Sequence, residues 1–272
     1  LFILYMIGYS TFLFLAVVIG SSELFKKRQQ EKLKNTLLQD YYIPISIVVP
    51  GYNEEVTVVE TVRSLLALEY KLYEIIVVDD GSSDLCKPVF DAIENFAPCV
   101  LLRHPQNRGK GAALKTAFAF FLEHRPDRDV VVSADADGQH LTKDIDAVSM
   151  ACLEQEGVVL GVRDFSAPQV PGRSKFGNRT TSMVFRLFFG MRIQDTQTGL
   201  RAFSKQVLPS MMAVAGERYE YETNMLFAIN KENIPLTQVG IDTVYLDDNQ
   251  SSHFRVIRDS IRVYGLILKY LL

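Results

Sequence analysis

Short apolar runs alternate with longer amphipathic stretches between residues 45 and 162. The runs of strand length are Ile45 to Val49, Ile75 to Val78, Val100 to Arg103, Val130 to Ser133 and Val158 to Val162. The helical patterns between them are Glu54 to Leu68, Pro88 to Phe96, Gly111 to Phe121 and Lys143 to Leu153. This order predicts an α/β fold with a doubly wound, mostly parallel sheet flanked by helices. Ligands of such sheets bind at the carboxyl ends of the strands.

The start of the chain has the pattern of a membrane span. From Leu1 to Gly20 no residue is charged, and a helix of that length, at about 1.5 Å per residue, crosses a hydrocarbon layer of about 30 Å. A basic cluster beside a span marks the cytosolic side, so we expect the body in the cytosol; the cluster is Lys26, Lys27, Arg28, Lys32 and Lys34. A cleaved signal peptide is the alternative, but the chain shows neither its basic start nor an A-x-A-like site.

These patterns divide the chain into four parts. Residues 1–22 form the predicted transmembrane helix, 23–42 a basic linker, 43–250 the α/β domain and 251–272 an amphipathic helix, after which a further membrane region stays open. In the last part, apolar residues recur at helical spacing beside a stripe of arginines: Phe254, Ile257, Ile261, Tyr264 and Leu268 beside Arg255, Arg258 and Arg262. Such a helix either lies on acidic headgroups or caps the sheet.

Charge and cysteine content narrow the function classes. The net charge of −3 lacks the strong basic excess of a nucleic-acid-binding protein. Cys86, Cys99 and Cys152 are odd in number and form no C-x-x-C pair, so they predict neither a zinc site nor a disulfide framework.

Paired carboxylates end two of the predicted strands. Asp135 and Asp137 follow Val130 to Ser133 at a spacing that places both on one side of an extended chain, and Gln139 comes next. Carboxylate and amide oxygens suit Mg²⁺ or Mn²⁺, although Asp-x-Asp before Gly is also typical of a solvated turn. Asp79 and Asp80 end an earlier strand. Two such strand ends predict one crevice that binds a nucleotide diphosphate.

Two other phosphate-binding patterns do not fit. The first strand is followed by P-G-Y-N-E-E rather than G-x-G-x-x-G, which removes the main support for a dinucleotide-binding domain. The segment N-R-G-K-G at 107 to 111 lacks the glycine spacing and the Ser or Thr of a P-loop. Lys110 in that segment either pairs with a phosphate or is solvated.

Seven motifs follow one another along the chain: V-V-P-G-Y-N-E-E at 48–55, V-V-D-D-G-S-S-D at 77–84, N-R-G-K-G-A-A at 107–113, D-A-D-G-Q at 135–139, G-V-R at 161–163, D-T-Q-T-G-L-R-A-F at 195–203 and Y-E-Y-E-T-N-M at 219–225. In this order they resemble the motifs of family 2 glycosyltransferases of the GT-A fold. The later motifs resemble the branch of dolichyl-phosphate glucosyltransferases and bacterial polyprenyl-phosphate glycosyltransferases. The likeness runs from about Ile45 to Tyr264.

This resemblance implies roles for individual residues. The nucleotide sugar would be bound by Pro50, Tyr52, Asn53, Glu54, Asp79, Asp80, Lys110, Asp135 and Arg163, with Asp80 on the nucleobase or ribose, Asp79 in support and Arg163 near the phosphates. The metal would be held by Asp135, Asp137 and Gln139. The lipid phosphate would be bound by Arg173, Asn178, Arg179 and Arg201. The chain has no Trp and so no Q-x-x-R-W motif of processive members, which favours a single transfer.

The acceptor decides whether a base is needed. A phosphate acceptor already carries negative charge near neutral pH, since its second pKa is about 6. A hydroxyl acceptor would need a carboxylate to take its proton, and Asp195, Glu220 and Glu222 are the candidates, of which the resemblance favours Asp195 and Glu222. An Asx turn is the structural alternative for Asp195, and a helix cap near Tyr221 is the alternative for Glu222.

A lipid acceptor is also favoured by the stretch from Arg173 to Phe189, which mixes basic and large apolar residues as membrane-interface helices do. The alternative is an ordinary amphipathic helix on the sheet. We therefore expect inverting transfer of one hexose, glucose from UDP-glucose, to a dolichyl or undecaprenyl phosphate. The enzyme would lie at the plasma or inner membrane of a bacterium or at the endoplasmic reticulum of a eukaryote. Mannose or N-acetylglucosamine donors, a polysaccharide or protein hydroxyl acceptor, a silent nucleotide-sugar-binding scaffold and a homo-oligomer stay open.

Overall fold

The computed structural model describes residues 44–54, 57–68, 72–165, 170 and 172–242, together with residues 2, 6, 8–12, 14, 26 and 28. The chain divides into two compact units, Leu1–Tyr42 and Ile43–Leu272. The described residues of the first unit are helical. Within the described part of the chain, no helix has both the length and the apolar character to cross a membrane. Most of the predicted span and linker, and the whole predicted helix 251–272, lie outside the described residues.

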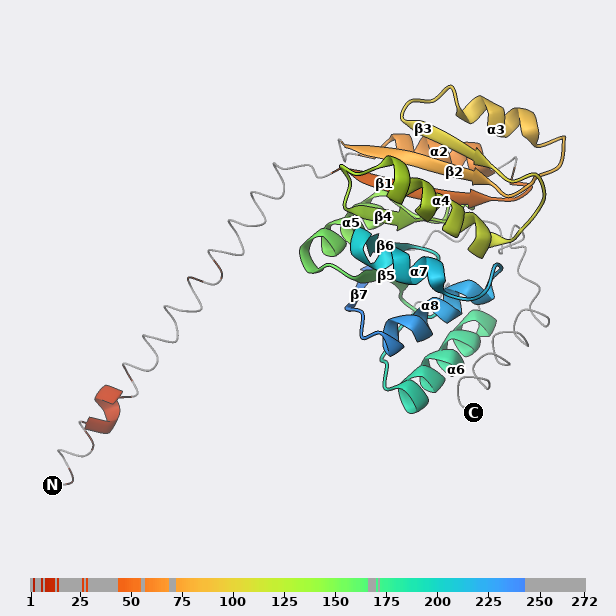
Figure 1. Cartoon of the computed structure of the whole chain (residues 1–272). Coiled ribbons are helices and arrows are strands. Elements are labelled where there is room, and N and C mark those ends of the chain that lie inside the picture. Colours follow the sequence, from red (N-terminus) through yellow and green to blue (C-terminus); the bar gives the residue numbers. More distant parts are fainter. Residues whose placement is uncertain are drawn as a thin grey trace. The chain divides into compact units, whose positions relative to one another are not determined.

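The second unit is built on one seven-stranded sheet (Figure 1). Its strands are β1 (Ile45–Gly51), β2 (Tyr73–Asp79), β3 (Cys99–Arg103), β4 (Val130–Ser133), β5 (Val158–Arg163), β6 (Arg201–Ser204) and β7 (Leu236–Ile241). Their order across the sheet is β3-β2-β1-β4-β6-β5-β7. All neighbours are parallel except β6, which runs antiparallel to both β4 and β5. The predicted mostly parallel sheet is confirmed.

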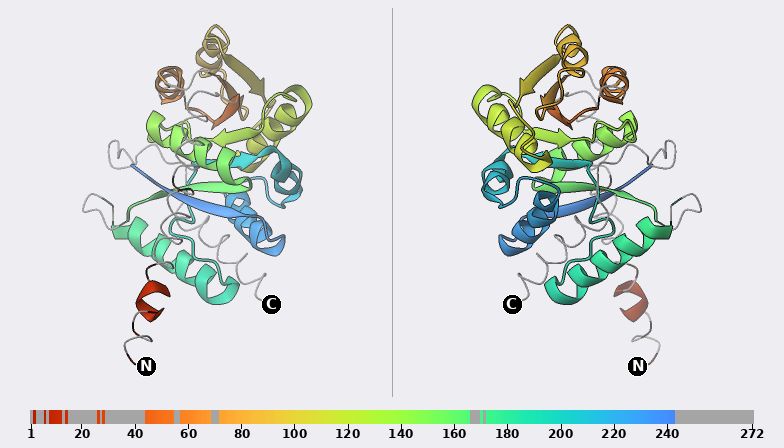
Figure 2. Two further views of the ribbon diagram at one scale, coloured as in Figure 1. Left: turned by 90° about the vertical axis from the view of Figure 1, so that its left-hand side faces the viewer. Right: turned by 90° about the vertical axis from the view of Figure 1, so that its right-hand side faces the viewer.

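Helices cover both faces of this sheet. They are α2 (Thr57–Leu66), α3 (Lys87–Ile93), α4 (Lys110–His124), α5 (Thr142–Gln155), α6 (Gly172–Phe189), α7 (Leu208–Ala213) and α8 (Glu220–Lys231), with a short 3-10 helix, η1 (Lys205–Val207). The end-on views of Figure 2 place α4, α7 and α8 on one side of the sheet and α2 and α5 on the other. The fold is thus a sheet between two helical layers.

The core forms because the central strands are apolar on both faces. The four residues of β4 are all buried, as continuous apolar strands inside parallel sheets are. On the side of α4, the rings of Phe118 and Phe203 meet edge to face at 5.2 Å between centroids. The hydroxyl of Tyr221 donates to the carbonyl of Met211 at 2.8 Å, which joins α8 to α7.

The five predicted strands and four predicted helices of the first 162 residues are all present, with ends shifted by at most three residues and β4 unchanged at both ends. The helix predicted from Glu54 begins at Thr57. Two strands had no counterpart in the prediction. β6 has only four residues and begins with an arginine, and β7, at the sheet edge, mixes polar and apolar residues in the order Leu-Thr-Gln-Val-Gly-Ile. Neither has the apolar run of a central strand.

Candidate active site

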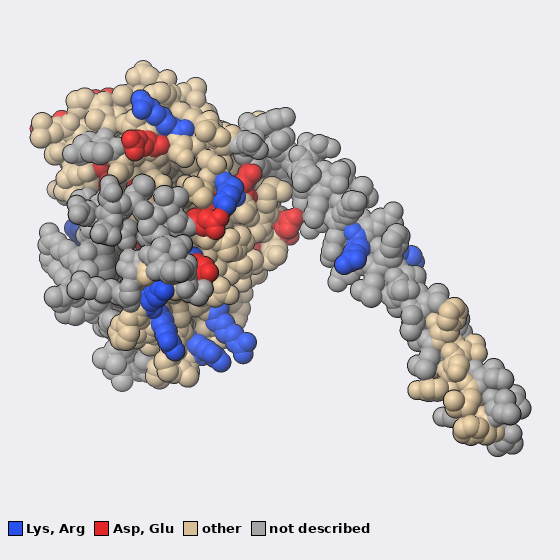
Figure 3. Space-filling view, turned by 180° about the vertical axis from the view of Figure 1, so that it is seen from behind, with Lys and Arg blue, Asp and Glu red and all other residues tan. Residues whose placement is uncertain are grey.

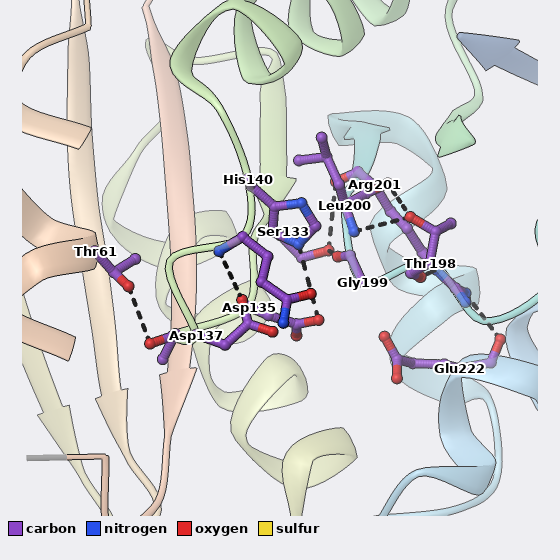
Figure 4. A network of polar contacts seen from close by, with 12 residues as sticks. Thr61, Ser133, Asp135, Asp137, His140, Thr198, Gly199, Leu200, Arg201 and Glu222 are labelled. Atoms are coloured by element: carbon purple, nitrogen blue, oxygen red, sulfur yellow. Dashed lines mark hydrogen bonds and ion pairs between the residues drawn. The ribbon is translucent and has the colours of Figure 1, made fainter. Parts of the chain in front are cut away.

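The loop after β4 carries the paired carboxylates. The backbone NH of Ala134 donates to Val48 of the neighbouring strand at 2.9 Å, and the hydroxyl of Thr61 on α2 donates to the carbonyl of Ala136 at 3.0 Å. The chain then turns, and the NH of Gln139 donates to Asp137 Oδ1 at 3.1 Å. The turn that was the alternative interpretation is therefore present, and the same loop also carries the Asp135 and Asp137 carboxylates. Figure 4 shows Asp135 and Asp137 together on this loop, with the carboxylate of Glu222 pointing toward them.

Lys110 connects two distant parts of the chain at this loop. Its Nζ lies 2.7 Å from Asp135 Oδ1 and 2.9 Å from Glu222 Oε1. The side chains of Lys110, Asp135 and Glu222 keep 17%, 31% and 13% of their surface exposed, so a ligand can reach them. Lys110 is the first residue of α4, and Glu222 lies in the first turn of α8. Lys110 is thus an ion-pair partner of Asp135 and Glu222 and is not merely solvated.

These contacts set the protonation of the cluster. Burial alone would lower the pKa of Lys110, but Asp135 and Glu222 outweigh it and raise that pKa. Burial would raise the pKa of Asp135, yet Lys110 and His140 hold it well below its usual range. The pKa of Asp137 is raised, first by burial and then by repulsion from Asp135. The cluster therefore holds more carboxylate than its lysine balances.

That excess fits a divalent cation. Within the described residues, no three His, Cys, Asp or Glu side chains gather closely enough to form a complete metal cage. Asp135 and Asp137 form a carboxylate pair instead, which suits Mg²⁺ or Mn²⁺ bound through one or two carboxylates, water and substrate phosphates. The ring of His140 lies behind the pair, with Nε2 3.8 Å from Asp135 Oδ2. The donor set present fits such a metal.

The two aspartates that end β2 are buried and tie neighbouring loops together. Asp80 accepts hydrogen bonds from His104 Nδ1 at 2.6 Å and from the backbone NH groups of Arg108 and Gly109 at 2.9 and 2.7 Å. It therefore holds the loop that leads into Lys110. Asp79 Oδ2 accepts from Arg103 Nε at 2.9 Å. Asp79 is 0% and Asp80 3% exposed, so neither presents free surface to a nucleotide.

The loop that follows β1 contacts the residues that follow Asp79 and Asp80. Asn53 accepts from the NH of Ser83 at 2.9 Å and donates its own NH to Ser82 Oγ at 3.0 Å, in a left-handed conformation with φ of 54°. Glu54 accepts from the hydroxyl of Thr57 at 2.6 Å. Tyr52 is 37% exposed and Pro50 is partly buried. Six of the nine predicted nucleotide residues thus lie at the carboxyl ends of β1 and β2, while Lys110 begins α4, Asp135 follows β4 and Arg163 ends β5.

The glycines of N-R-G-K-G serve helix packing. A Cβ on Gly111 would lie 2.6 Å from the Cβ of Tyr221, and the NH of Ala112 donates to the carbonyl of Glu217 at 2.9 Å. Only glycine lets α4 begin this close to α8. The segment therefore brings Lys110 and Glu222 together by bringing their two helices together.

Asp195 is fully buried against Arg163. Arg163 Nε lies 2.6 Å from Oδ2 and Nη2 lies 3.1 Å from Oδ1, and the NH of Gln197 also donates to Oδ1 at 3.0 Å. The last bond is the Asx turn expected as the alternative for this residue. Asp195 has 0% exposure, so it cannot meet a substrate hydroxyl without displacing Arg163. It orients Arg163 at the end of β5.

Of the four predicted lipid-phosphate residues, two are buried. Asn178 donates to the carbonyl of Gln194 at 2.6 Å and accepts from the NH of Thr196 at 3.0 Å. Arg201 is 1% exposed and donates to two backbone carbonyls. Both side chains hold loops, and direct contact with a lipid phosphate stays a prediction. Arg179 is exposed on α6, and Arg173 lies on the same helix with its side chain outside the described part.

Glu222 does not cap its helix. The N-cap of α8 is Tyr219 and makes no side-chain cap bond, and it is Glu220 whose Oε1 accepts from the NH of Arg218 at 3.3 Å. The Glu222 carboxylate is directed to Lys110 instead. Sequence reasoning did not find Thr61, Gly199 or Ser133, which hold the carboxylate loop, since contacts between distant segments leave no local pattern.

A mostly parallel sheet that carries paired carboxylates and a lysine at its carboxyl edge belongs to the class of α/β proteins that bind ligands at that edge. The family model for glycosyl transferase family 2 matches residues 46–212. The chain belongs to this family and is a glycosyltransferase.

Named relatives extend this assignment. The chain is 30% identical, over 75% of its length and 86% of the relative's, to a UDP-N-acetylglucosamine–dolichyl-phosphate N-acetylglucosaminyltransferase of Methanococcus voltae. It is 29% identical to a dolichyl-phosphate beta-glucosyltransferase of Dictyostelium discoideum, over 81% of this chain and 74% of the relative.

A solved structure shares the fold. Glucosyl-3-phosphoglycerate synthase of Mycobacterium tuberculosis, crystallised with Mn²⁺, UDP and phosphoglyceric acid, superposes with a TM-score of 0.61 at 20% identity, over 84% of this chain and 78% of that one. The architecture is the GT-A fold.

Proposed function

We propose that the chain transfers one hexose, glucose from UDP-glucose, to a polyprenyl phosphate at the cytosolic membrane face, with inversion at the sugar carbon. The observation that carries this proposal is that a cation already pairs with both carboxylates that the family resemblance favours as the base. Glu222 is paired with Lys110 and Asp195 with Arg163. A hydroxyl acceptor needs a carboxylate that can accept its proton, whereas a phosphate acceptor brings its own negative charge.

The site must also stabilise the negative charge of the phosphates and of the leaving nucleoside diphosphate. Asp135, Asp137 and Gln139 would hold Mg²⁺ or Mn²⁺, which when bound stabilises the departing nucleoside diphosphate. Lys110 lies beside Asp135 and can balance charge that gathers on the phosphates during transfer. Arg163, held in place by Asp195 and 23% exposed, can do the same from β5. The Mn²⁺ and UDP bound by the structural neighbour support this arrangement.

Helix α6 supports a lipid acceptor. Its apolar side chains Phe176, Met183, Leu187 and Phe188 are 59% to 74% exposed, and its basic residues include Lys175, Arg179 and Arg186. Figure 3 shows basic side chains gathered at the lower end of this unit, where Figure 1 places α6. Burying each large apolar side chain in a bilayer interface would contribute about 1.5–3 kcal/mol. We propose that this face contacts the membrane that holds the acceptor.

Acceptor chemistry is tested by a radiolabel transfer assay with Mn²⁺ or Mg²⁺. The matched acceptors are undecaprenyl phosphate and undecaprenol, which differ only in the phosphate, and the donors are UDP-glucose, UDP-N-acetylglucosamine and GDP-mannose. We expect organic-extractable label with the phosphate only, and the productive donor identifies the sugar. Label on undecaprenol would overturn the phosphate proposal and make Glu222 the base. Donor binding with no transfer to any acceptor would favour a silent scaffold.

The membrane face is tested by flotation with vesicles that contain acidic lipid. Leu187→Glu with Phe188→Glu should reduce the bound fraction severalfold, because both side chains are exposed on α6. The control is Leu72→Glu, since Leu72 is 47% exposed beside the start of β2. An equal loss in the control would argue against a specific face on α6.

A further inference from the structure

The segment from Thr198 to Arg201, which follows the Asp195 turn and enters strand β6, contacts both residues that Lys110 joins: the carboxylate of Asp135 and the backbone carbonyl of Glu222. Its members lie close together in Figure 4, beside Asp135 on one side and Glu222 on the other. We call residues 198–201 the bridging segment. It contains a glycine and a buried arginine, and each makes one of the two contacts.

Gly199 lies directly against Asp135. A Cβ placed on Gly199 would come within 2.7 Å of Asp135 Oδ1 and 2.5 Å of its Cγ, and nearer still to Oδ2. Real side chains do not approach so closely, so any residue larger than glycine would displace the carboxylate. The backbone of Gly199 thus forms one wall of the position that Asp135 occupies.

Ser133 fixes that wall. Its hydroxyl donates to the carbonyl of Gly199 at 3.0 Å, and Ser133 pairs with Arg201 in the antiparallel ladder of β4 and β6. Ser133 is 3% exposed and lies two residues before Asp135. The strand that presents Asp135 therefore also holds the backbone that confines it.

Arg201 makes the contact to α8. Its Nε donates to the carbonyl of Thr198 at 2.9 Å and its Nη1 to the carbonyl of Glu222 at 2.8 Å. Nη2 meets no acceptor among the described residues, so these two carbonyls hold the guanidinium. A planar guanidinium can serve two fixed acceptors at once, which a lysine ammonium does with less geometric constraint.

We infer that Gly199 and Arg201 are positioning residues that fix the Asp135 carboxylate for the metal-bound diphosphate and fix Glu222 relative to it. Arg201 then acts on the reaction through Glu222 and the bridging segment, without touching a lipid phosphate. The inference rests on the proposed metal site, but it does not depend on the identity of the acceptor.

The experiment measures Mn²⁺ binding in the presence of UDP by the loss of the free Mn²⁺ signal in electron paramagnetic resonance. It needs no acceptor, so it is informative even if the lipid proposal fails. Gly199→Ala should weaken Mn²⁺ binding at least tenfold. The control is Gly240→Ala, because a Cβ there meets nothing within 4 Å, and its binding should be unchanged. Unchanged binding by a folded Gly199→Ala variant would overturn the inference.

Two milder variants keep the test decisive if Gly199→Ala does not fold. Ser133→Ala removes one hydrogen bond and should weaken Mn²⁺ binding about twofold to fivefold. Arg201→Lys keeps the charge and should lower kcat at least tenfold with the donor KM within twofold, at a temperature where circular dichroism shows the variant folded. Wild-type Mn²⁺ binding in Ser133→Ala together with wild-type kcat in Arg201→Lys would mean that the bridging segment is only structural.

Discussion

Both ends of the sheet hold an ionic cluster, and the two clusters differ in their charge balance. At the amino end, Glu74 accepts from Ser46 Oγ at 2.5 Å and from Arg125 Nε at 2.7 Å, and Arg128 Nε lies 3.4 Å away. One acid there meets two cations.

At the carboxyl end, Asp135 and Glu222 both pair with Lys110, and Asp137 lies near enough to Asp135 to be repelled by it. Two acids there share one lysine, and a third acid lies near them. At the amino end the basic side chains outnumber the acid, whereas at the carboxyl end the acids outnumber the lysine, so only the carboxyl end can bind a further positive charge. We expect damage at the first end to lower stability and damage at the second to lower activity.

The largest effect should come from Asp137→Asn. Loss of one metal carboxylate removes charge stabilisation of the leaving group, so transfer should fall at least about 10²–10³-fold. Repulsion from Asp135 also disappears, so the free energy of unfolding should stay within about 0.5 kcal/mol or rise. Transfer rates and urea unfolding measure the two quantities. Near-normal turnover would remove Asp137 from the site.

Glu74→Ala tests the opposite end. Breaking a buried ion pair leaves Arg125 without its partner and should lower the free energy of unfolding by about 3–5 kcal/mol. The rate per folded molecule should change less than twofold. Asp91→Asn is the control, since Asp91 pairs with Arg103 with 58% of its side chain exposed and should cost at most about 1 kcal/mol. A large loss of kcat in Glu74→Ala would contradict the division between the two ends.

Lys110→Met removes the lysine shared by the acids. Two carboxylates lose their partner, which should cost about 1–3 kcal/mol of stability. A divalent cation can replace part of that charge, so Mn²⁺ should raise the melting temperature of the variant more than that of the wild type. Thermal unfolding with and without Mn²⁺ measures both. Equal Mn²⁺ shifts in the two proteins would mean that Lys110 and the metal do not share a site.

The smallest effect concerns Cys152, which lies near the amino end of β5 and whose Sγ contacts the carbonyl of Gly157 at 3.8 Å. Burial raises the pKa of this thiol to about 12. The folded state then retains a proton that the unfolded state releases from about pH 8.5, so stability is full below that pH and falls as pH rises toward 12.

By pH 10 the loss should be about 1–2 kcal/mol, measured by urea unfolding, and Cys152→Ala should lack that part of the decline. An identical decline in the variant would assign it to other groups.

Much of the fold could be predicted from the sequence, because β1 to β5 are continuous apolar runs separated by helical patterns. The position of the site could be predicted as well, since Asp79, Asp135 and their neighbours follow those strands. Burial could not. Asp80 and Arg201 lie in family motifs, and the resemblance implies a role for Asn178 as well, yet their side chains are held by segments 16 to 29 residues away or by loop carbonyls. Such roles depend on packing between segments, which spacing within a motif does not encode.

The antiparallel strand β6 lies between two parallel neighbours, and through it the second half of the chain enters the edge built by the first. The two halves share a hydrophobic core as well as the sheet, and at the carboxyl edge Lys110 contacts Glu222 and Asp135 contacts Gly199. A substitution in the second half therefore acts on carboxylates carried by the first. Exchanging one half between relatives would preserve this edge only if the residues that meet there are exchanged together.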